Sequence, residues 1–416
     1  MNFTDEYEVI PTALVYGGDA LARLPDGRAV FIPFALPDEK IRIRLVEDKE
    51  RYARGEILEI VSPSPKRVQP RCTHYGDCGG CHYQHIPYQE QIKIKQSILI
   101  DQLERIGKIP DPPVQEIIPS LKDWHYRNYI QFHISENGEP GFLKHRSKQL
   151  IPIQECHLPE ESLNQVWPAF SLEYIPGLDL ISLRSGDEGQ DTLVVLQSSD
   201  PKPIEFTVDV PLSAVHQGPG GEIVLAGDDF TIIPVNEFPF VVSAGSFFQV
   251  NTGTAGLLVD FLLERLPLEA ETIILDVYCG VGLFSAFIAP RVSKVIGIES
   301  DIKAGEDFSY NLSGFDNVEF YNSPAEEVLP FLDLSPDIIL LDPPQEGITK
   351  TVLDSVVILN PDLIVYISCD PATLARDAAR LIKQGYSLLE STPIDMFPQT
   401  LNIESINIFQ SASKEA

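Results

Sequence analysis

The sequence predicts an α/β protein whose C-terminal part is a doubly wound, mostly parallel sheet. From residue 246 onward, short apolar runs alternate with segments of helical spacing, which is the pattern of such a sheet. A glycine turn at residues 276–285 directly follows the first buried run, at 272–276. Before residue 62, five short strands separated by turn signals indicate a small OB-like β-barrel.

The length and composition are those of a protein with two or three domains. The chain has 416 residues, of which 44% are hydrophobic, so there is ample material for several cores. We predict an OB-like barrel over 1–62, a central subdomain over 63–240 with an antiparallel sheet and a cysteine-rich loop, and a doubly wound domain over 241–416. A helix expected over 88–106 should pack on the C-terminal domain.

The charge balance limits the partners that the chain can hold. A net charge of −30 argues against nonspecific binding to polyanions, so a nucleic acid would need local basic patches. One candidate patch is an alternating strand with Arg42 and Arg44 on one face, although a solvated face explains these arginines equally well. The other is a basic strand at 141–148. No run of 18 apolar residues and no signal-peptide pattern occur, so we expect a cytoplasmic protein without a membrane span.

The glycine turn has the features of a nucleoside site. Gly280 and Gly282 lie between a buried strand and a helix start, where backbone can approach a ligand closely. The next strand, 294–299, ends in Glu299, 19 residues past Gly280, and an acid there can accept both ribose hydroxyls of an adenosine. Because the GxGxxG spacing is absent, S-adenosylmethionine (SAM) fits better than a dinucleotide. The alternative is a tight turn followed by a surface glutamate.

Four of the six cysteines indicate a metal site. Cys72, Cys78 and Cys81 lie within ten residues around a double glycine, and Cys156 is the isolated candidate for a fourth ligand. Zinc usually shows two Cys-x2-Cys pairs, whereas three clustered cysteines and one distant one favour a [4Fe–4S] cluster. Zinc, or no metal, remains the alternative, and nearby histidines are possible substitutes: His74, His82 and His157.

A fifth cysteine is placed where a nucleophile would stand. Cys369 ends the apolar run 362–369 and precedes a helix, whose N-terminus can lower a thiol pKa. Asp276 and Asp342 also end predicted strands, and ligands bind at the carboxyl ends of the strands in such sheets. The alternative, a buried structural cysteine, applies more readily to Cys279.

Taken together, these motifs resemble the RNA uracil-C5 methyltransferase family, in its branch with an N-terminal TRAM domain and a [4Fe–4S] cluster. The resemblance covers nearly the whole chain, and the order and number of the motifs make it specific. The matching motifs are the cysteines 72, 78, 81 and 156, Tyr-Arg-Asn at 126–128, Phe-Phe-Gln-Val-Asn at 247–251, the glycine loop at 276–282, Asp-Pro-Pro at 342–344, Ser-Cys-Asp-Pro at 368–371 and the segment 397–404.

The resemblance implies a role for each matching residue. Cys369 would be the nucleophile and Glu404 the proton acceptor. Phe247 would stack on the target base, and Gln249 and Asp342 would contact the cofactor or the base. The SAM site would comprise the glycine loop with its flanking tyrosine and the ribose acid: Tyr278, Gly280, Gly282 and Glu299.

The implied reaction is SAM-dependent methylation of C5 of a uridine in RNA through a covalent adduct of Cys369 with C6. The resemblance favours rRNA over tRNA and a monomer. Alternatives are tRNA or another acceptor, a non-catalytic RNA-binding or folding factor, and a redox or cluster-sensing protein. Two positions depart from the family pattern, since Gln345 replaces a usual arginine and Asn402 a usual histidine. Both departures remove possible positive charge.

Overall fold

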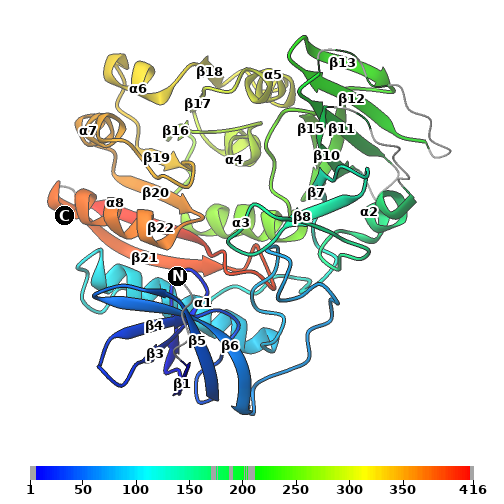
Figure 1. Cartoon of the computed structure of the whole chain (residues 1–416). Coiled ribbons are helices and arrows are strands. Elements are labelled where there is room, and N and C mark those ends of the chain that lie inside the picture. Colours follow the sequence, from blue (N-terminus) through cyan, green and yellow to red (C-terminus); the bar gives the residue numbers. More distant parts are fainter. Residues whose placement is uncertain are drawn as a thin grey trace.

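In the computed structural model, three large sheets follow one another along the chain (Figure 1). The structure describes residues 6–169, 175, 177–186, 191–200, 202, 204 and 211–412. The N-terminal sheet lies below the C-terminal sheet in this view, and the central sheet lies to the right (Figure 1). No helix among these residues is long and apolar enough to cross a membrane.

The N-terminal module is a six-stranded sheet in the order β1-β5-β6-β4-β3-β2. Its long strand β5 alternates buried and exposed residues, so that Ile41, Ile43 and Leu45 enter the core. The described pairings leave β1 and β2 as free ends, so the predicted barrel is not closed. The strands are β1 (Glu6–Val9), β2 (Ala13–Leu14), β3 (Ala20–Arg23), β4 (Ala29–Ile32), β5 (Lys40–Asp48) and β6 (Tyr52–Ser62).

The exposed face of β5 is a row of ion pairs. Arg42 pairs with Glu59 at 2.5 Å, and Arg44 pairs with Glu56 on the neighbouring strand. Lys40 pairs with Glu8 in the same way, at 2.6 Å. The arginines that the sequence offered as a phosphate-binding face are therefore matched by acids across the strands, as on a solvated face.

Helix α1 (Tyr88–Arg105) connects the N-terminal module to the C-terminal domain. Leu99 and Leu103 of this helix are buried in one core with Leu374 of α8 (Pro371–Lys383). On the same helix Lys95 is fully buried, with its ammonium 2.6 Å from Asp395 Oδ1. The helix thus packs against the domain that carries the glycine loop.

The central sheet has seven strands in the order β13-β12-β11-β10-β7-β8-β9. It is antiparallel except where β11 and β12 run parallel, so the prediction of a purely antiparallel sheet is wrong at that pair. Its strands are β7 (Tyr129–Ile134), β8 (Pro140–Leu143), β9 (Leu150–Pro152), β10 (Leu178–Ser185), β11 (Thr192–Ser198), β12 (Ser213–Gly218) and β13 (Gly221–Ala226), with α2 (Glu161–Val166) after β9.

The strand at residues 230–235 lies within the central subdomain expected over 63–240, but it does not join the central sheet. It pairs with the next segment as a separate two-stranded ribbon, β14 (Phe230–Val235) and β15 (Phe238–Ser243). The ribbon carries Phe240 and Val242 into the core of the C-terminal domain, because one of its faces is apolar.

The C-terminal sheet has the order β18-β17-β16-β19-β20-β22-β21. The first five strands are parallel, and β22 and β21 are antiparallel additions at one edge. The strands are β16 (Ile273–Val277), β17 (Lys294–Glu299), β18 (Val318–Asn322), β19 (Ile338–Leu341), β20 (Leu363–Ser368), β21 (Tyr386–Ile394) and β22 (Glu404–Ser411).

Helices cover both faces of this sheet, as the doubly wound pattern predicts. Alternate residues of β16 show the division, since Ile274 packs with α3 and α4 while Leu275 packs with α1, α7 and α8. The helices are α3 (Thr252–Arg265), α4 (Leu283–Ile288), α5 (Ile302–Asn311), α6 (Ala325–Val328), α7 (Lys350–Leu359) and α8, and 3-10 turns occupy Trp167–Ala169, Ala289–Arg291 and Leu329–Phe331. The loops after β16, β17, β19 and β20 therefore meet at one edge.

Candidate active site

A cavity of about 630 Å³ opens at this edge of the C-terminal sheet. Its walls come from the loops after β16, β17, β19 and β20, from the segment before α3, and from the start of β22. Eight of the residues singled out in the sequence line it: Phe247, Gln249, Tyr278, Gly280, Glu299, Asp342, Cys369 and Glu404. The two positions that depart from the family pattern, Gln345 and Asn402, line the same cavity.

The glycine loop contains three residues with left-handed backbone. Tyr278, Gly280 and Gly282 have φ values of 66°, 53° and 94°. A Cβ on Gly280 would meet no atom within 4 Å, so the cavity wall there is bare backbone. Gly282 has a different role: its Cβ would lie 2.3 Å from Leu312 Cδ1, and it does not line the cavity. It permits close packing of α4 on α5, without offering its own surface to a ligand.

Glu299 is held rigidly at the end of β17. One oxygen accepts the backbone N–H of Gly280 at 3.1 Å. The other accepts the N–H groups of Ser300 at 2.7 Å and Asp301 at 2.8 Å. These bonds join the two loops after β16 and β17, and they fix a carboxylate where a ribose would lie beside the glycine loop.

The cavity is strongly acidic. Burial, followed by the charges of Asp276 and Glu299, raises the pKa of Asp342 to about 7. Burial likewise raises the pKa of Asp276 to about 7, although its bond to Ser285 Oγ at 2.6 Å acts against this rise. The pKa of Glu404 is raised well above its usual value, by burial and by Asp342. Since no Lys, Arg or His among the described residues lines this cavity, the site favours a positively charged ligand.

Cys369 lies directly after β20, just before the N-terminus of α8. The neighbouring Asp370 caps this helix, since its Oδ1 accepts the N–H groups of Ala372 at 3.0 Å and Thr373 at 2.7 Å. Burial raises the pKa of the Cys369 thiol to about 12, followed by the charges of Glu404, Asp342 and Asp370. Burial and these three acids therefore disfavour the thiolate, and a cation in the cavity would favour it.

Phe247 and Gln249 differ sharply in exposure. The ring of Phe247 is 70% exposed at the rim, an unusual position for a large aromatic side chain, while Gln249 is buried. Their segment is held by Asn128, whose Nδ2 donates to Gln249 O and to Thr252 Oγ1, each at 3.0 Å. The Tyr-Arg-Asn motif thus supports this wall of the cavity from the central subdomain.

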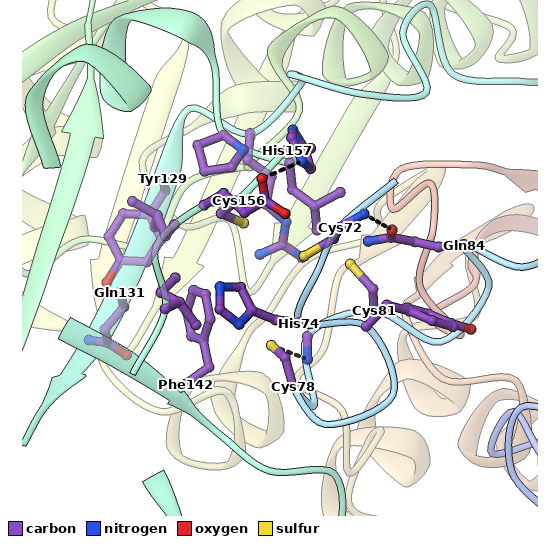
Figure 2. A pocket seen from close by; sticks show the side chains of 18 residues that line it. Cys72, His74, Cys78, Cys81, Gln84, Tyr129, Gln131, Phe142, Cys156 and His157 are labelled. Atoms are coloured by element: carbon purple, nitrogen blue, oxygen red, sulfur yellow. Dashed lines mark hydrogen bonds and ion pairs between the residues drawn. The ribbon is translucent and has the colours of Figure 1, made fainter. Parts of the chain in front are cut away.

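A second cavity, of about 310 Å³, is lined by Cys72, Cys78, Cys81 and Cys156 (Figure 2). Three of these cysteines come from one loop, and Cys156 faces them from the opposite side (Figure 2). Burial raises the pKa of all four thiols, to about 12 for Cys81 and Cys156. Within the described ranges, no three His, Cys, Asp or Glu side chains are yet arranged as ligands around one point.

Arg127 also lines this cavity and is unusual in its burial. Its Nε is buried and has no hydrogen-bond partner among the described residues. Burial acts to lower the pKa of this guanidinium, but Tyr126, followed by the charges of Cys81 and Cys156, raises it above its usual value. A buried cation with a free donor beside four thiols is the setting that a negatively charged metal–thiolate group requires.

Known protein families match segments in both the N-terminal and the C-terminal part of the chain. A family model described as tRNA (Uracil-5-)-methyltransferase matches residues 230–411, and a TRAM domain model matches residues 5–58. A protein of Halalkalibacterium halodurans named an uncharacterised RNA methyltransferase is 32% identical over 99% of this chain and 98% of its own length. The chain belongs to the RNA uracil-5-methyltransferase family.

Two further matches agree with this assignment. An uncharacterised RNA methyltransferase of Aquifex aeolicus is 35% identical over 95% of this chain and 96% of its own length. The crystal structure of Pyrococcus abyssi tRNA (uracil-54, C5)-methyltransferase in complex with S-adenosyl-L-homocysteine superposes with a TM-score of 0.74. That match covers 97% of this chain and all of the other at 24% identity, which supports the predicted fold class.

Some residues at the site were not found from the sequence. Ser300 and Asp301 line the main cavity, and Asp301 also caps α5 through Ala304 N at 2.8 Å. An aspartate two residues after Glu299 and directly before a helical segment is a helix-cap signal that would have revealed Asp301. Tyr16 of the N-terminal module reaches Asp370, the residue after Cys369, and no local sequence pattern marks it.

Proposed function

We propose that this protein transfers a methyl group from SAM to C5 of a uridine in RNA, with Cys369 as nucleophile and Glu404 as proton acceptor. The observation that carries the proposal is that one cavity holds the Cys369 thiol, the Glu404 carboxyl, the Glu299 site and the exposed Phe247 ring. An acidic cavity suits the sulfonium of SAM, which is the methyl donor in this chemistry. Glu299 would accept the ribose hydroxyls.

The chemistry follows from the properties of uracil. C5 is a weak nucleophile until the Cys369 thiolate adds to C6, which places electron density on C5. C5 then takes the methyl group, the Glu404 carboxylate removes the C5 proton, and the electrons of that C–H bond form the C5–C6 double bond as sulfur leaves. A carboxyl of raised pKa accepts this proton strongly once it is ionised.

The target base must leave its stack to reach Cys369. The exposed Phe247 ring at the rim is suited to hold such a base by stacking, because a base presents an aromatic face. Gln249, buried beside it, would read an edge of the base or contact the cofactor.

An open groove of about 760 Å³ is the surface that we propose for the RNA backbone. Its lining includes Lys144, Arg146 and Lys148 together with three histidines, and no acid among the described residues lines it, in contrast to the net charge of the chain. Lys144 pairs with Asp77 and Arg146 with Asp19 beside the groove, whereas Lys148 is the cation that we expect to meet a phosphate. It also includes Gly17 and Leu401, whose segments adjoin the main cavity. A single RNA strand bound along this groove would therefore lead to Cys369, the proposed nucleophile.

We also propose a [4Fe–4S] cluster on the four cysteines of the second cavity. The supporting observations are the four buried thiols around one cavity and the unpartnered Nε of Arg127. Three ligands from one glycine-containing loop and a distant fourth favour iron–sulfur over zinc. The cluster would fix the loop at 72–81 to the segment around Cys156, and its role is structural in this proposal.

The remaining features of the proposal are its substrate class, assembly and location. We favour rRNA as the substrate, as the resemblance of the motifs implies. The second candidate is tRNA, because the matching family model and the superposed Pyrococcus abyssi enzyme are both named for tRNA. We further propose a cytoplasmic monomer with a TRAM module over 1–62, a central subdomain over 63–240 and a methyltransferase domain over 241–416.

The test is a methyl-transfer assay with protein purified without oxygen. Methyl-labelled SAM is supplied with unmodified large-subunit rRNA and, in parallel, with unmodified tRNA transcripts. Label recovered in 5-methyluridine establishes the reaction, and the labelled transcript gives the substrate class. SAM binding without label in either RNA would overturn the proposal. Iron and sulfide analysis of the same preparation, with the Cys81→Ser variant as comparison, tests the cluster separately.

A further inference from the structure

The N-terminal module reaches the nucleophile loop through one tyrosine. Tyr16 lies in the turn between β2 and β3, which is closed by bonds from Val15 N to Asp19 O at 2.9 Å and from Gly18 N to Val15 O at 3.0 Å. Gly17 and Gly18 in this turn have φ values of +91° and +83°. The Tyr16 hydroxyl donates a hydrogen bond to Asp370 Oδ2, which is 354 residues away in the sequence.

Other contacts hold the turn in this place. A Cβ on Gly18 would lie 3.2 Å from Leu401 Cδ2, in the segment that leads to Glu404. Asp19 forms ion pairs with Arg54 at 3.0 Å and with Arg146 at 2.8 Å. The turn therefore contacts the residue directly after Cys369 and the segment before Glu404, and Tyr16 is positioned by more than its own bond.

The Asp370 carboxylate stands next to the nucleophile with three donors around it. Its Oδ1 accepts two N–H groups at the start of α8, and its Oδ2 accepts the Tyr16 hydroxyl. The charged groups that raise the pKa of Cys369 are Glu404 from β22, Asp342 after β19 and Asp370 itself, all of them acids. Gln345 and Asn402, which line the same cavity, are neutral.

We infer that Tyr16 is a positioning residue for Cys369, which acts through Asp370: it holds the turn after β20 and screens the Asp370 charge from the thiol. This inference rests on the proposed role of Cys369 as nucleophile. The Tyr16 hydroxyl is the only donor from the N-terminal module to Asp370 among the interactions of the described residues. Without it Oδ2 would keep its full charge beside the sulfur.

The electrostatic consequence has a defined sign. A more effective negative charge next to a thiol disfavours the thiolate, so removing the Tyr16 hydroxyl should raise the pKa of Cys369. If the Tyr16 hydroxyl served only to pack the turn, its removal would instead increase the reactivity of Cys369. A looser turn exposes the sulfur to reagents but leaves the charge of Asp370 unchanged. These two effects can therefore be separated by one pH profile.

The experiment measures alkylation of Cys369 by iodoacetamide as a function of pH in the intact, anaerobically purified protein. The peptide that carries Cys369 is quantified by mass spectrometry, so that the other cysteines do not contribute. The variants are Tyr16→Phe, Asp370→Asn and the double variant. Tyr52→Phe is the matched control, because its ring packs edge-on against Phe31 within the same module. Circular dichroism confirms that each variant is folded.

We expect Tyr16→Phe to move the profile to higher pH, with an alkylation rate roughly threefold to tenfold lower on its rising limb. Asp370→Asn should move it to lower pH, and adding Tyr16→Phe to that variant should cause no further shift. An unshifted profile in Tyr16→Phe, or an equal shift in the Asp370→Asn background, would overturn the inference. Since alkylation requires neither SAM nor RNA, a shifted profile with no methyl transfer would count against the proposed reaction and leave the link between Tyr16 and Cys369 standing.

Discussion

The Lys95 ammonium lies 2.6 Å from Asp395 Oδ1, and both side chains are fully buried. Lys95 also donates to Phe397 O at 2.9 Å. This buried ion pair joins α1 to the segment that leads to Glu404, so it links a helix outside the catalytic domain to the proposed proton acceptor. Removing one partner leaves a buried charge uncompensated, which costs more than the pair itself contributes.

Lys95→Met should therefore destabilise the protein by about 3–5 kcal/mol and lower activity through disorder near Glu404. Urea denaturation measures the change in the free energy of unfolding. The control is Lys93→Met on the same helix, where an exposed ion pair with Glu90 should contribute about 0–1 kcal/mol. Equal effects of the two changes would show that burial of the Lys95 pair has no energetic role.

The Glu299 carboxylate accepts three backbone N–H groups and faces the cavity. Glu299→Gln should weaken SAM binding roughly tenfold or more, because the amide offers only one acceptor oxygen and no charge to a ribose. Calorimetric titration with S-adenosylhomocysteine measures this. Glu319→Gln, an exposed position paired with Lys294 on the neighbouring strand, should bind normally. Unchanged affinity in Glu299→Gln would show that the Glu299 carboxylate does not bind the ribose.

Asp276 predicts a pH dependence of stability. Its pKa is raised to about 7 by burial, whereas an unfolded aspartate titrates near 4. The folded state therefore binds the proton more tightly, and this stabilisation, complete below about pH 4, is lost as pH rises to about 7. Asp276→Asn, which cannot ionise, should gain stability relative to the natural protein on the order of 2–4 kcal/mol at pH 8.

Thermal unfolding at pH 5 and pH 8 checks this sign. The melting temperature of Asp276→Asn should exceed that of the natural protein by more at pH 8 than at pH 5. Asp333→Asn serves as a control, since this carboxyl lies in the loop before β19, away from the cavity lining. A gain that is the same at both pH values would show that Asp276 is already ionised in the folded protein at pH 5.

The basic groove predicts a change in the salt dependence of RNA binding. Lys148→Ala should weaken binding and reduce the slope of log K against log salt by roughly one per lost phosphate contact. Arg42→Ala is the control, because Arg42 is already paired with Glu59 at 2.5 Å. Filter binding over a range of salt concentrations separates the two. A larger effect at Arg42 would move the RNA path to the outer face of β5.

The sequence predicted the parallel core of the catalytic domain well, for a physical reason. Strands buried on both faces are almost continuously apolar, so the run 294–299 coincides with β17 and places Glu299 at its end. Cys369 follows β20 in the same way. In contrast, β21 mixes exposed and buried residues at the sheet edge, and no strand was predicted there.

Other features depended on contacts that sequence spacing does not encode. The sequence pattern placed Gly282 in the cofactor loop. In the structure, a glycine is needed there because a Cβ would collide with Leu312. The ribbon of β14 and β15 spans the boundary expected at residue 240, and the alternation of its residues does not indicate which strand each one pairs with. Tyr16 meets Asp370 across 354 residues, and such a pair is set by the docking of whole modules.

The most direct test of the central claim is a search for the Cys369 adduct in the Glu404→Gln variant. With the proton acceptor removed, the methylated uridine should stay bound to sulfur after SAM and substrate RNA are added. Denaturing electrophoresis would show a protein–RNA complex, and mass spectrometry should locate a methylated uridine nucleotide on the peptide that carries Cys369. Complete 5-methyluridine formation without any adduct, undiminished in Cys369→Ala, would contradict the account.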